Sequence, residues 1–370
     1  MDSLPQEIID EIIDNLPRSS LLSSSLVAKR WRTRSQQRAF RKIYFCFEFE
    51  VKKWHMDTQG DPGGISSYIQ RARFNNITEW KNPALFSHVL MNFNSLTTLL
   101  IFNTEIPDEV FERISHGELA GNRVTALYFL SMRSSLVIPM ILAFQNLRIL
   151  FIYNLTVTPR EPPLPLPALL QGRQLDSLRV VQCTNGVAEA LANARFESRH
   201  LTLDVQTENI QKLLVLSSVT VVELMLLGVY LLYVYHRSIN GDFTDFPESS
   251  TSHPINLLQF PALTSLKIFI SGHAPSPHLI NTLSPISSAP LLASIALECW
   301  WQLPSEPSPP NTWGHLDGWL SRTAKNATVE GGLVLTLTRW LGGQVPDVFF
   351  PQFREVGKIN TDSKGLRVFS

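Results

Sequence analysis

The chain has 370 residues, enough for two or three structural units, and 44% of them are hydrophobic while only 17% are charged. This composition predicts a packed apolar core and excludes an intrinsically disordered chain. Lysine plus arginine equals aspartate plus glutamate, 32 against 32, so the chain lacks the excess positive charge that drives binding to nucleic acid.

The first predicted element is an amphipathic helix between Ser3 and Leu16. Ser3 followed by Gln6 indicates a capping-box start, Pro5 suits the first turn, and Pro17 disfavours helix at Leu16. Acidic residues fill one face, whereas apolar residues recur at intervals of three and four: Leu4, Ile8, Ile9, Ile12, Ile13 and Leu16. The same segment lacks the basic start and unbroken apolar run of a secretory signal, so export is not expected.

Two further short helices are predicted before residue 45. The second helix is expected to start at Ser19 or Ser20, whose hydroxyl groups would serve as N-caps. An apolar stripe then runs along Leu21, Leu22, Leu26, Val27 and Trp31, beside Lys29, Arg30, Arg32 and Arg34. A unit of about 45 residues is near the lower size limit for burying its own core, so part of this apolar surface is expected to pack against a partner or the rest of the chain.

The segments LPQEIIDEIIDNL and SLLSSSLVAKRW resemble an F-box of the type common in mushroom-forming fungi. The resemblance is carried, in order and at the usual separations, by Leu4-Pro5, Glu7-Ile8, Ile12, Leu16, Leu21-Leu22, Ser25-Leu26-Val27 and Lys29-Arg30-Trp31. In F-box proteins these helices pack on a small Skp-type adaptor, which ties a receptor to a cullin scaffold. The resemblance therefore implies this adaptor as partner, with Leu4, Pro5, Ile8, Ile12, Leu16 and Leu22 as interface residues and with Leu26, Val27 and Trp31 divided between interface and internal core.

Beyond Phe45 a motif of the form L-x-x-L-x-L recurs, in steps of 23 to 29 residues over its first copies. Such self-similarity indicates a solenoid of stacked repeats. Two partial copies occur at residues 201–203 and 333–335, and the full copies lie at residues 96–101, 124–129, 147–152, 175–180, 221–226, 263–268 and 292–297.

Each copy predicts one short strand of a parallel sheet, with the middle and last apolar residues pointing inward. Helices are predicted between strands at residues 107–114, 187–194 and 209–216, and loops at the proline-rich segments 160–167 and 303–310 and the insertion 236–261. The apolar run 213–235 is long enough to span a membrane, but its valines, its Gly228 and its Glu223 favour a buried strand.

This body resembles the degenerate leucine-rich repeats that follow F-boxes in many fungal and plant proteins. Of the asparagine ladder of a regular repeat, Asn103 and Asn154 are present, and Cys183 is predicted to take an equivalent place. The predicted fold is thus α/β: a three-helix F-box at residues 1–45, a linker and N-terminal cap at 46–90, and an irregular leucine-rich-repeat-like solenoid with a parallel sheet at 91–370.

Sites for chemistry are not predicted. Among the sequence motifs of hydrolases, nucleotide-binding proteins and zinc proteases, GxSxG, GxGxxG, GxxxxGK[ST] and HExxH are all absent. His273 and His278 lack metal-ligand spacing, and Asp57 and Asp61 supply too few oxygen ligands for Ca²⁺. No enzyme, cofactor or metal is therefore expected. The widely spaced Cys46, Cys183 and Cys299 form no CxxC pair, and we expect free thiols and an intracellular location, cytoplasmic or nuclear.

Two functional hypotheses follow. The first is a substrate-recognition subunit of an SCF-type (Skp, cullin, F-box) ubiquitin ligase, which holds an unknown target protein on its concave strand face or terminal loops. The alternative is an interaction scaffold without a ligase, in which the three helices only cap the repeat body. The C-terminal tryptophans could close the solenoid or bind a partner, and end closure is favoured: Trp300, Trp301, Trp313, Trp319 and Trp340.

Overall fold

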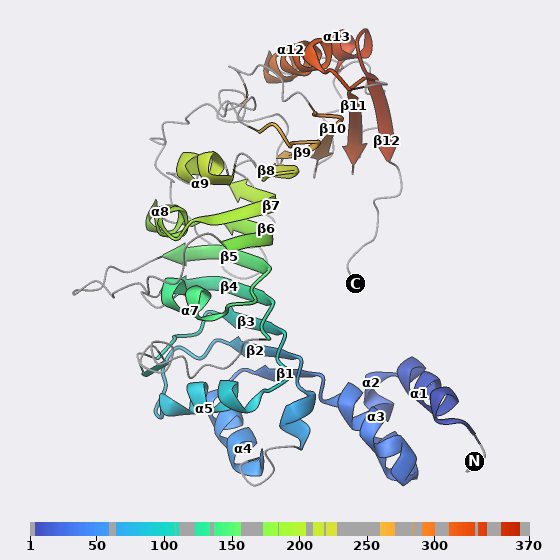
Figure 1. The fold of residues 1–370 in the computed structure, drawn as a ribbon, viewed down its shortest axis with the longest axis vertical. Coiled ribbons are helices and arrows are strands. Elements are labelled where there is room, and N and C mark those ends of the chain that lie inside the picture. Colours follow the sequence, from blue (N-terminus) through green and yellow to red (C-terminus); the bar gives the residue numbers. More distant parts are fainter. Residues whose placement is uncertain are drawn as a thin grey trace. The chain divides into compact units, whose positions relative to one another are not determined.

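A computed structural model describes residues 4–58, 64–107, 109–110, 123–133, 137–156, 173–183, 185–204, 210–217, 220–227, 260–270, 283, 291–299, 311–329, 332–338 and 349–362. The chain divides into two compact units, Met1–Leu170 and Gln171–Ser370. Both are α/β, with parallel strands joined in part by helices (Figure 1). The predicted loops at 160–167 and 303–310, most of the insertion 236–261, and the His273 and His278 positions lie outside the described residues.

The first unit begins with three short helices, α1 (Gln6–Asn15), α2 (Arg18–Val27) and α3 (Lys29–Ala39). Leu16 is extended, with φ −72° and ψ 142°, as predicted for a residue before proline. The predicted serine N-caps of the second helix are wrong: α2 already begins at Arg18, after Pro17, without a side-chain cap hydrogen bond. The fixed φ of Pro17 favours this earlier start and leaves Ser19 and Ser20 inside the first turn. The predicted cap residue Ser3 lies outside the described residues.

Five parallel strands follow in the first unit and pair in chain order. They are β1 (Lys42–Phe45), β2 (Arg71–Asn75), β3 (Thr98–Phe102), β4 (Ala126–Arg133) and β5 (Ile149–Thr156). The helices between them are α4 (Glu48–Thr58), the 3₁₀ turn η1 (Ile65–Tyr68), α5 (Ala84–Asn92) and α7 (Val137–Ala143). The sheet thus begins at Lys42, two strands before the first recurring motif. Phe45 and Phe74 are buried at the register position that Ile101, Phe129 and Ile152 take in the later strands.

The second unit continues with seven parallel strands, again paired in chain order. They are β6 (Arg173–Val181), β7 (Phe196–Asp204), β8 (Glu223–Leu227), β9 (Ser265–Ile270), β10 (Ser294–Cys299), β11 (Val334–Thr338) and β12 (Lys358–Asp362). Its helices are α8 (Asn185–Asn193), α9 (Ile210–Ser217), α12 (Asn311–Asn326) and α13 (Pro351–Arg354).

Several expectations about these segments are met. Helices α8 and α9 confirm the predicted helices near residues 187–194 and 209–216, whereas the predicted helix at 107–114 lies largely outside the described residues. Of the apolar run 213–235, which was predicted to be a buried strand, only Glu223–Leu227 forms a strand, β8. Residues 213–217 belong to helix α9, and residues 218, 219 and 228–235 are not described. No helix in the described part of the chain has the length and apolar character needed to cross a membrane.

The hydrophobic core contains the inward-facing residues of the strands. The prediction that the middle and last apolar residues of each motif point inward is confirmed. All three apolar positions of each full motif copy are buried, since none is more than 4% exposed. The middle and last positions are Leu99 and Ile101, Leu127 and Phe129, Leu150 and Ile152, Leu178 and Val180, Leu224 and Leu226, Leu266 and Ile268, and Ile295 and Leu297.

Two further features repeat with the motif. A phenylalanine three residues before the first leucine is buried at Phe93, Phe144 and Phe260, and each of its carbonyls accepts the leucine N–H at 3.0 to 3.2 Å. The residue two places after the last apolar position adopts a left-handed backbone: Asn76, Asn103, Ser131, Asn154 and Gln182, with φ between 41° and 59°. Asparagine suits this conformation better than most residues.

The column of left-handed residues, Asn76, Asn103, Ser131, Asn154 and Gln182, corrects the prediction for Cys183. Cys183 does not take the asparagine place, because Gln182 has the left-handed φ of 55° and Cys183 is the next residue, which is buried. Within the column the Asn103 side-chain amide Nδ2 donates to Asn76 Oδ1 at 3.1 Å. The misassignment arose because the sequence shows the spacing of apolar residues but not the backbone torsion between them.

Near the C-terminal end of the second unit, aromatic residues pack between α12 and α13. Trp313 and Trp319 are buried; Trp300, Trp301 and Trp340 lie outside the described residues. Closure of the solenoid end by these tryptophans stays a prediction. Both oxygens of the buried Asp317 carboxylate accept backbone N–H groups at the start of α13, Oδ2 from Gln352 at 2.9 Å and Oδ1 from Phe353 at 2.8 Å. Burial raises the pKa of Asp317 despite these hydrogen bonds.

An ionic cluster crosses three strands of the second unit. Glu223 on β8 accepts from Lys267 on β9 and lies 3.1 Å from the His200 ring nitrogen Nδ1 on β7. Partial burial alone would raise the pKa of Glu223, but the hydrogen bond and charge of Lys267, helped by His200, outweigh it and lower the pKa below 4.5.

We expect Lys267→Met to destabilise the second unit at neutral pH by less than about 1 kcal/mol, because water screens the half-exposed ammonium group. A carboxyl group with a lowered folded pKa contributes stability above its unfolded pKa and loses it as pH falls through the folded pKa. The difference between parent and variant should therefore be largest above pH 4.5 and vanish in stronger acid, as denaturant unfolding at a series of pH values would measure. The exposed Lys325→Met is the matched control, and an equal loss in both variants would contradict the assignment.

Candidate functional site

The three N-terminal helices enclose a small core of their own. Ile9 and Ile13 of α1, Leu21 of α2 and Ala39 of α3 are buried together. Around this core pack four partly buried side chains: Leu4, Leu16, Trp31 and Phe40. The three helices are thus held in a fixed arrangement by apolar contacts along one face of each.

A second set of apolar side chains on the same helices faces outward. Their exposed fractions are 42% for Ile8, 39% for Ile12, 54% for Leu22, 80% for Leu26 and 61% for Val27. Ile8 and Ile12 lie one turn apart on α1, and Leu22 and Leu26 lie one turn apart on α2, so each pair forms a stripe along its helix. A cluster of large exposed apolar residues on so small a helical unit is typical of a protein-binding surface.

The nine predicted interface residues divide between these two sets. Ile8, Ile12, Leu22, Leu26 and Val27 belong to the outer stripes, and Pro5 is also exposed. Leu4, Leu16 and Trp31 are partly buried against the internal core. The nine therefore do not form one uniform surface, and their role in adaptor binding stays a prediction.

A row of arginines on α3, which was not predicted from the sequence, holds α1 in place. Arg30 Nη2 donates to the Leu4 carbonyl at 2.8 Å. Arg34 bonds the Asp14 carboxylate through Nε at 2.9 Å and through Nη2. Arg38 Nη1 donates to the Ile13 carbonyl and reaches the Leu16 carbonyl at 3.4 Å. The spacing of four residues along α3 was the available signal, since it places the three guanidinium groups on one helix face.

Among these contacts between α3 and α1, the Asp14–Arg34 pair is an ion pair. The hydrogen bond from Arg34 lowers the pKa of the Asp14 carboxyl, assisted by the charges of Arg34, Arg38 and Arg41. Asp14 is therefore ionised at neutral pH. Because both side chains are about 40% exposed, the pair contributes little free energy on its own.

Arg38 offers the sharper test of these contacts, because its half-buried guanidinium donates to two carbonyls at the C-terminal end of α1, those of Ile13 and Leu16. The Ile13 carbonyl also accepts the Leu16 backbone N–H at 3.1 Å. We expect Arg38→Met to destabilise the three-helix unit by about 1 to 2 kcal/mol. Amide hydrogen exchange in α1 would measure the loss. Arg32→Met, an exposed change on the same helix, is the control and should alter exchange in α1 by far less; equal effects would contradict the role of Arg38.

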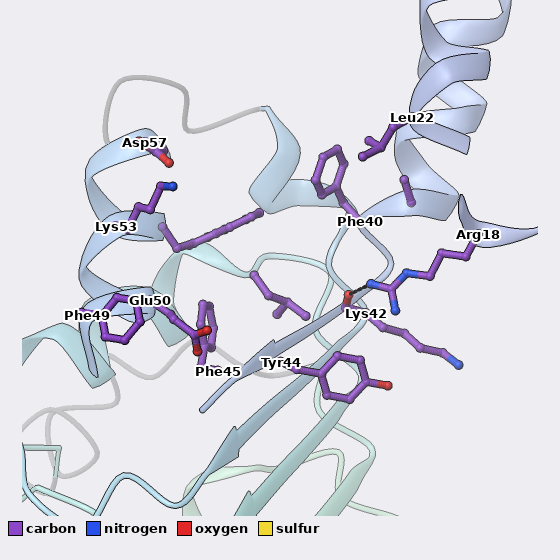
Figure 2. A pocket seen from close by; sticks show the side chains of 13 residues that line it. Arg18, Leu22, Phe40, Lys42, Tyr44, Phe45, Phe49, Glu50, Lys53 and Asp57 are labelled. Carbon is purple, nitrogen blue, oxygen red and sulfur yellow. Dashed lines mark hydrogen bonds between the residues drawn. The ribbon is translucent and has the colours of Figure 1, made fainter. Parts of the chain in front are cut away.

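A hollow of about 570 Å³ lies where the helices meet the sheet of the first unit. Figure 2 shows Leu22 and Phe40 on one side of it and Lys53 and Asp57 of α4 on another. Arg18 Nη2 donates to the Lys42 carbonyl at 3.0 Å beside it. Leu22 thus belongs both to the exposed stripe on α2 and to the lining of this hollow.

Comparison with known protein families matches residues 1–42 to the F-box domain. No curated protein matches the chain. The matched segment covers α1, α2 and α3 together with their exposed stripes. Residues 1–42 are therefore an F-box domain.

Proposed function

We propose that this chain is the substrate-recognition subunit of an SCF-type ubiquitin ligase. The F-box would bind a Skp-type adaptor through the stripes on α1 and α2, and the remaining body would hold a target protein. The observation that carries the proposal is the exposure of Ile8, Ile12, Leu22, Leu26 and Val27 on the matched domain. F-box domains bind Skp-type adaptors, and large apolar residues that stay exposed on a packed helical unit need such a partner.

The body is proposed to be an irregular leucine-rich-repeat-like solenoid, as its resemblance to fungal and plant F-box proteins suggests. Three repeated features support this: the buried apolar positions of each motif, the buried phenylalanine before three of the motifs, and the left-handed residue two places after the last apolar position. A main-chain hydrogen bond also recurs at one motif position, from Thr125 N–H to Thr97 O and from Arg148 N–H to Thr125 O. Recurrence of side-chain and main-chain features at one register is typical of stacked repeats.

The chain is further proposed to perform no chemistry itself and to act inside the cell, in the cytoplasm or nucleus. The sequence lacks the motifs of hydrolases, nucleotide-binding enzymes and zinc proteases, and its cysteines are widely spaced. Its contribution to ubiquitin transfer would be proximity, since holding a target at the ligase raises the local target concentration.

Co-purification of the full chain with a Skp-type adaptor tests this proposal. Retention of the adaptor, together with loss of retention when the outer stripes are altered, is the expected result. Failure of the unaltered chain to retain any Skp-type adaptor would contradict it.

The alternative, a scaffold in which the F-box helices only cap the body, rests on contacts within the first unit. Arg18 bonds the Lys42 carbonyl on β1, and Arg41 Nε donates to Gln70 Oε1 at 2.7 Å just before β2. A pure cap predicts that deletion of residues 1–41 unfolds the body and that the parent retains no adaptor. An adaptor-binding module predicts that the parent retains the adaptor whatever the deletion does to the body.

A further inference from the structure

The exposed face of the first unit's sheet carries large side chains in register. In a parallel sheet, paired residues of neighbouring strands project to the same side. One row crosses all five strands: Tyr44, Arg73, Leu100, Tyr128 and Phe151. A second row, two residues further along, contains Asn75, Phe102, Leu130 and Tyr153. We call these two rows the aromatic face.

The side chains of this face contact one another while remaining partly accessible. The Arg73 guanidinium lies 5.8 Å from the centre of the Phe102 ring, and Tyr128 and Phe151 meet edge to face at 6.0 Å. Phe151 also lies 6.5 Å from the Tyr153 ring. Tyr44 is 50% exposed, and the others are intermediate between buried and exposed. Aromatic and arginine side chains held in place by their neighbours are the residue types that dominate binding hot spots.

The charge of the aromatic face has one sign. Strands β1 to β5 contain no aspartate or glutamate, whereas Lys42, Arg71 and Arg73 supply positive charge, and the exposed Arg148 directly precedes β5. The row that passes through Arg73 continues to Tyr44, which lines the hollow of Figure 2. That hollow is lined by three basic residues, Arg18, Lys42 and Lys53, and by two acidic ones, Glu50 and Asp57. An apolar surface whose strands carry only basic charges is complementary to a segment that combines apolar and acidic side chains.

The sheet of the second unit differs at the matching positions. The row through Arg179 contains Thr202, Met225, Lys267, Ala296, Thr336 and Asn360, which are mostly small or polar. Acidic residues occur in its strands, and Glu223 already neutralises Lys267. The two units therefore carry chemically distinct faces. Among the described strand residues, the first unit's face joins aromatic rings to basic side chains, with no acidic residue on its strands.

We propose that the aromatic face is the docking surface for a target protein segment in which acidic residues alternate with leucine or aromatic residues. The proposal rests on the proposed receptor function and deepens it by naming the chemistry of the target. Phe102, Tyr128 and Phe151 would receive the apolar side chains, and Arg73 with Arg71 would pair with the carboxylates.

Three sets of immobilised synthetic peptides test the proposal with the full chain. The first alternates Asp or Glu with Leu, Phe and Trp; the second has Lys in place of the acids; the third keeps the acids but has Ser in place of the apolar residues. We expect the first set to bind at least about tenfold more tightly than either other set and to weaken as salt is added. Equal binding of the acidic and basic sets, or no binding of the first set, would overturn the proposal.

Substitutions locate the binding on this face. Arg73→Glu should remove the preference for the acidic set, and Phe151→Ala should weaken binding about tenfold or more. Arg179→Glu, the same change at the equivalent strand position of the second unit, should leave binding unchanged; an equal loss there would overturn the assignment. Adaptor retention is measured on every variant. If the chain retains the adaptor but binds the acidic and basic peptide sets equally, the docking surface is contradicted and the ligase function is not. If the chain prefers the acidic peptides but does not retain the adaptor, the ligase function is contradicted and the docking surface is not.

Discussion

The double variant Ile12→Asp with Leu26→Asp is expected to lose affinity for a Skp-type adaptor by about a hundredfold or more. Both side chains are exposed in the free chain, at 39% and 80%, so a carboxylate costs little there. In the complex each carboxylate would replace an apolar contact and would be desolvated without a partner, and interface positions of this kind contribute about 2 kcal/mol or more. Dissociation constants from calorimetry would measure the loss.

Matched controls separate loss of the interface from loss of the fold. Val215→Asp and Leu291→Asp introduce the same charge at apolar residues that are 57% and 52% exposed in the second unit, and both should keep parental affinity. Leu4→Asp is less informative, because Leu4 also packs against the internal core and its change could disrupt the helices themselves. Parental affinity in the double variant, with its helical content intact, would show that the outer stripes are not the adaptor surface.

Local patterns predicted much of the fold. The three-and-four spacing of apolar residues and the proline before α2 gave the first helix and its end, because both signals act within one turn of the chain. The recurring motif gave strands β3 to β6 and β8 to β10, since alternation along a strand separates buried from exposed side chains. Strands β1 and β2 were missed because neither completes the motif: Phe40 stands at the first position before β1, and Ala72 stands at the middle position of β2.

What could not be predicted depends on contacts between distant segments. The hydrogen bonds of Arg30, Arg34 and Arg38 to α1 join residues at least 20 positions apart, and only the packing of the helices brings them together. The same holds for the aromatic face. Arg73, Leu100, Tyr128 and Phe151 are unremarkable in sequence, and they form one surface only through the register of four neighbouring strands.

The sequence also does not show which apolar residues of α1 are buried and which are exposed. Ile8 and Ile9 are adjacent in sequence and identical in type, yet Ile8 is 42% exposed and Ile9 is 1% exposed. A helix of ten residues with apolar side chains on more than one face carries two stripes, and periodicity alone does not say which stripe faces the internal core. The structure places Ile9 and Ile13 in the core and leaves Ile8 and Ile12 exposed.

Trp313→Ala is expected to destabilise the second unit by about 3 to 5 kcal/mol, the range for removing a fully buried large aromatic side chain. Trp313 is 0% exposed. Its ring packs edge to face against two phenylalanine rings, with ring centres 5.5 Å apart for Phe349 and 5.8 Å apart for Phe350. The change would leave a cavity between α12 and the segment that leads into α13. Because unfolding of two units need not be a single transition, hydrogen exchange in β10 and β11 is the more specific measurement.

Trp313→Phe is the matched control, since it retains an aromatic ring and should lose much less stability than the alanine variant. Exchange in α1 and adaptor binding should be unchanged in both variants, because these belong to the first unit. If Trp313→Ala left exchange in β10 and β11 at the parental rate, Trp313 would not be part of the core that stabilises these strands. Loss of protection there with full adaptor retention would instead show that the C-terminal aromatic cluster stabilises the body independently of the F-box.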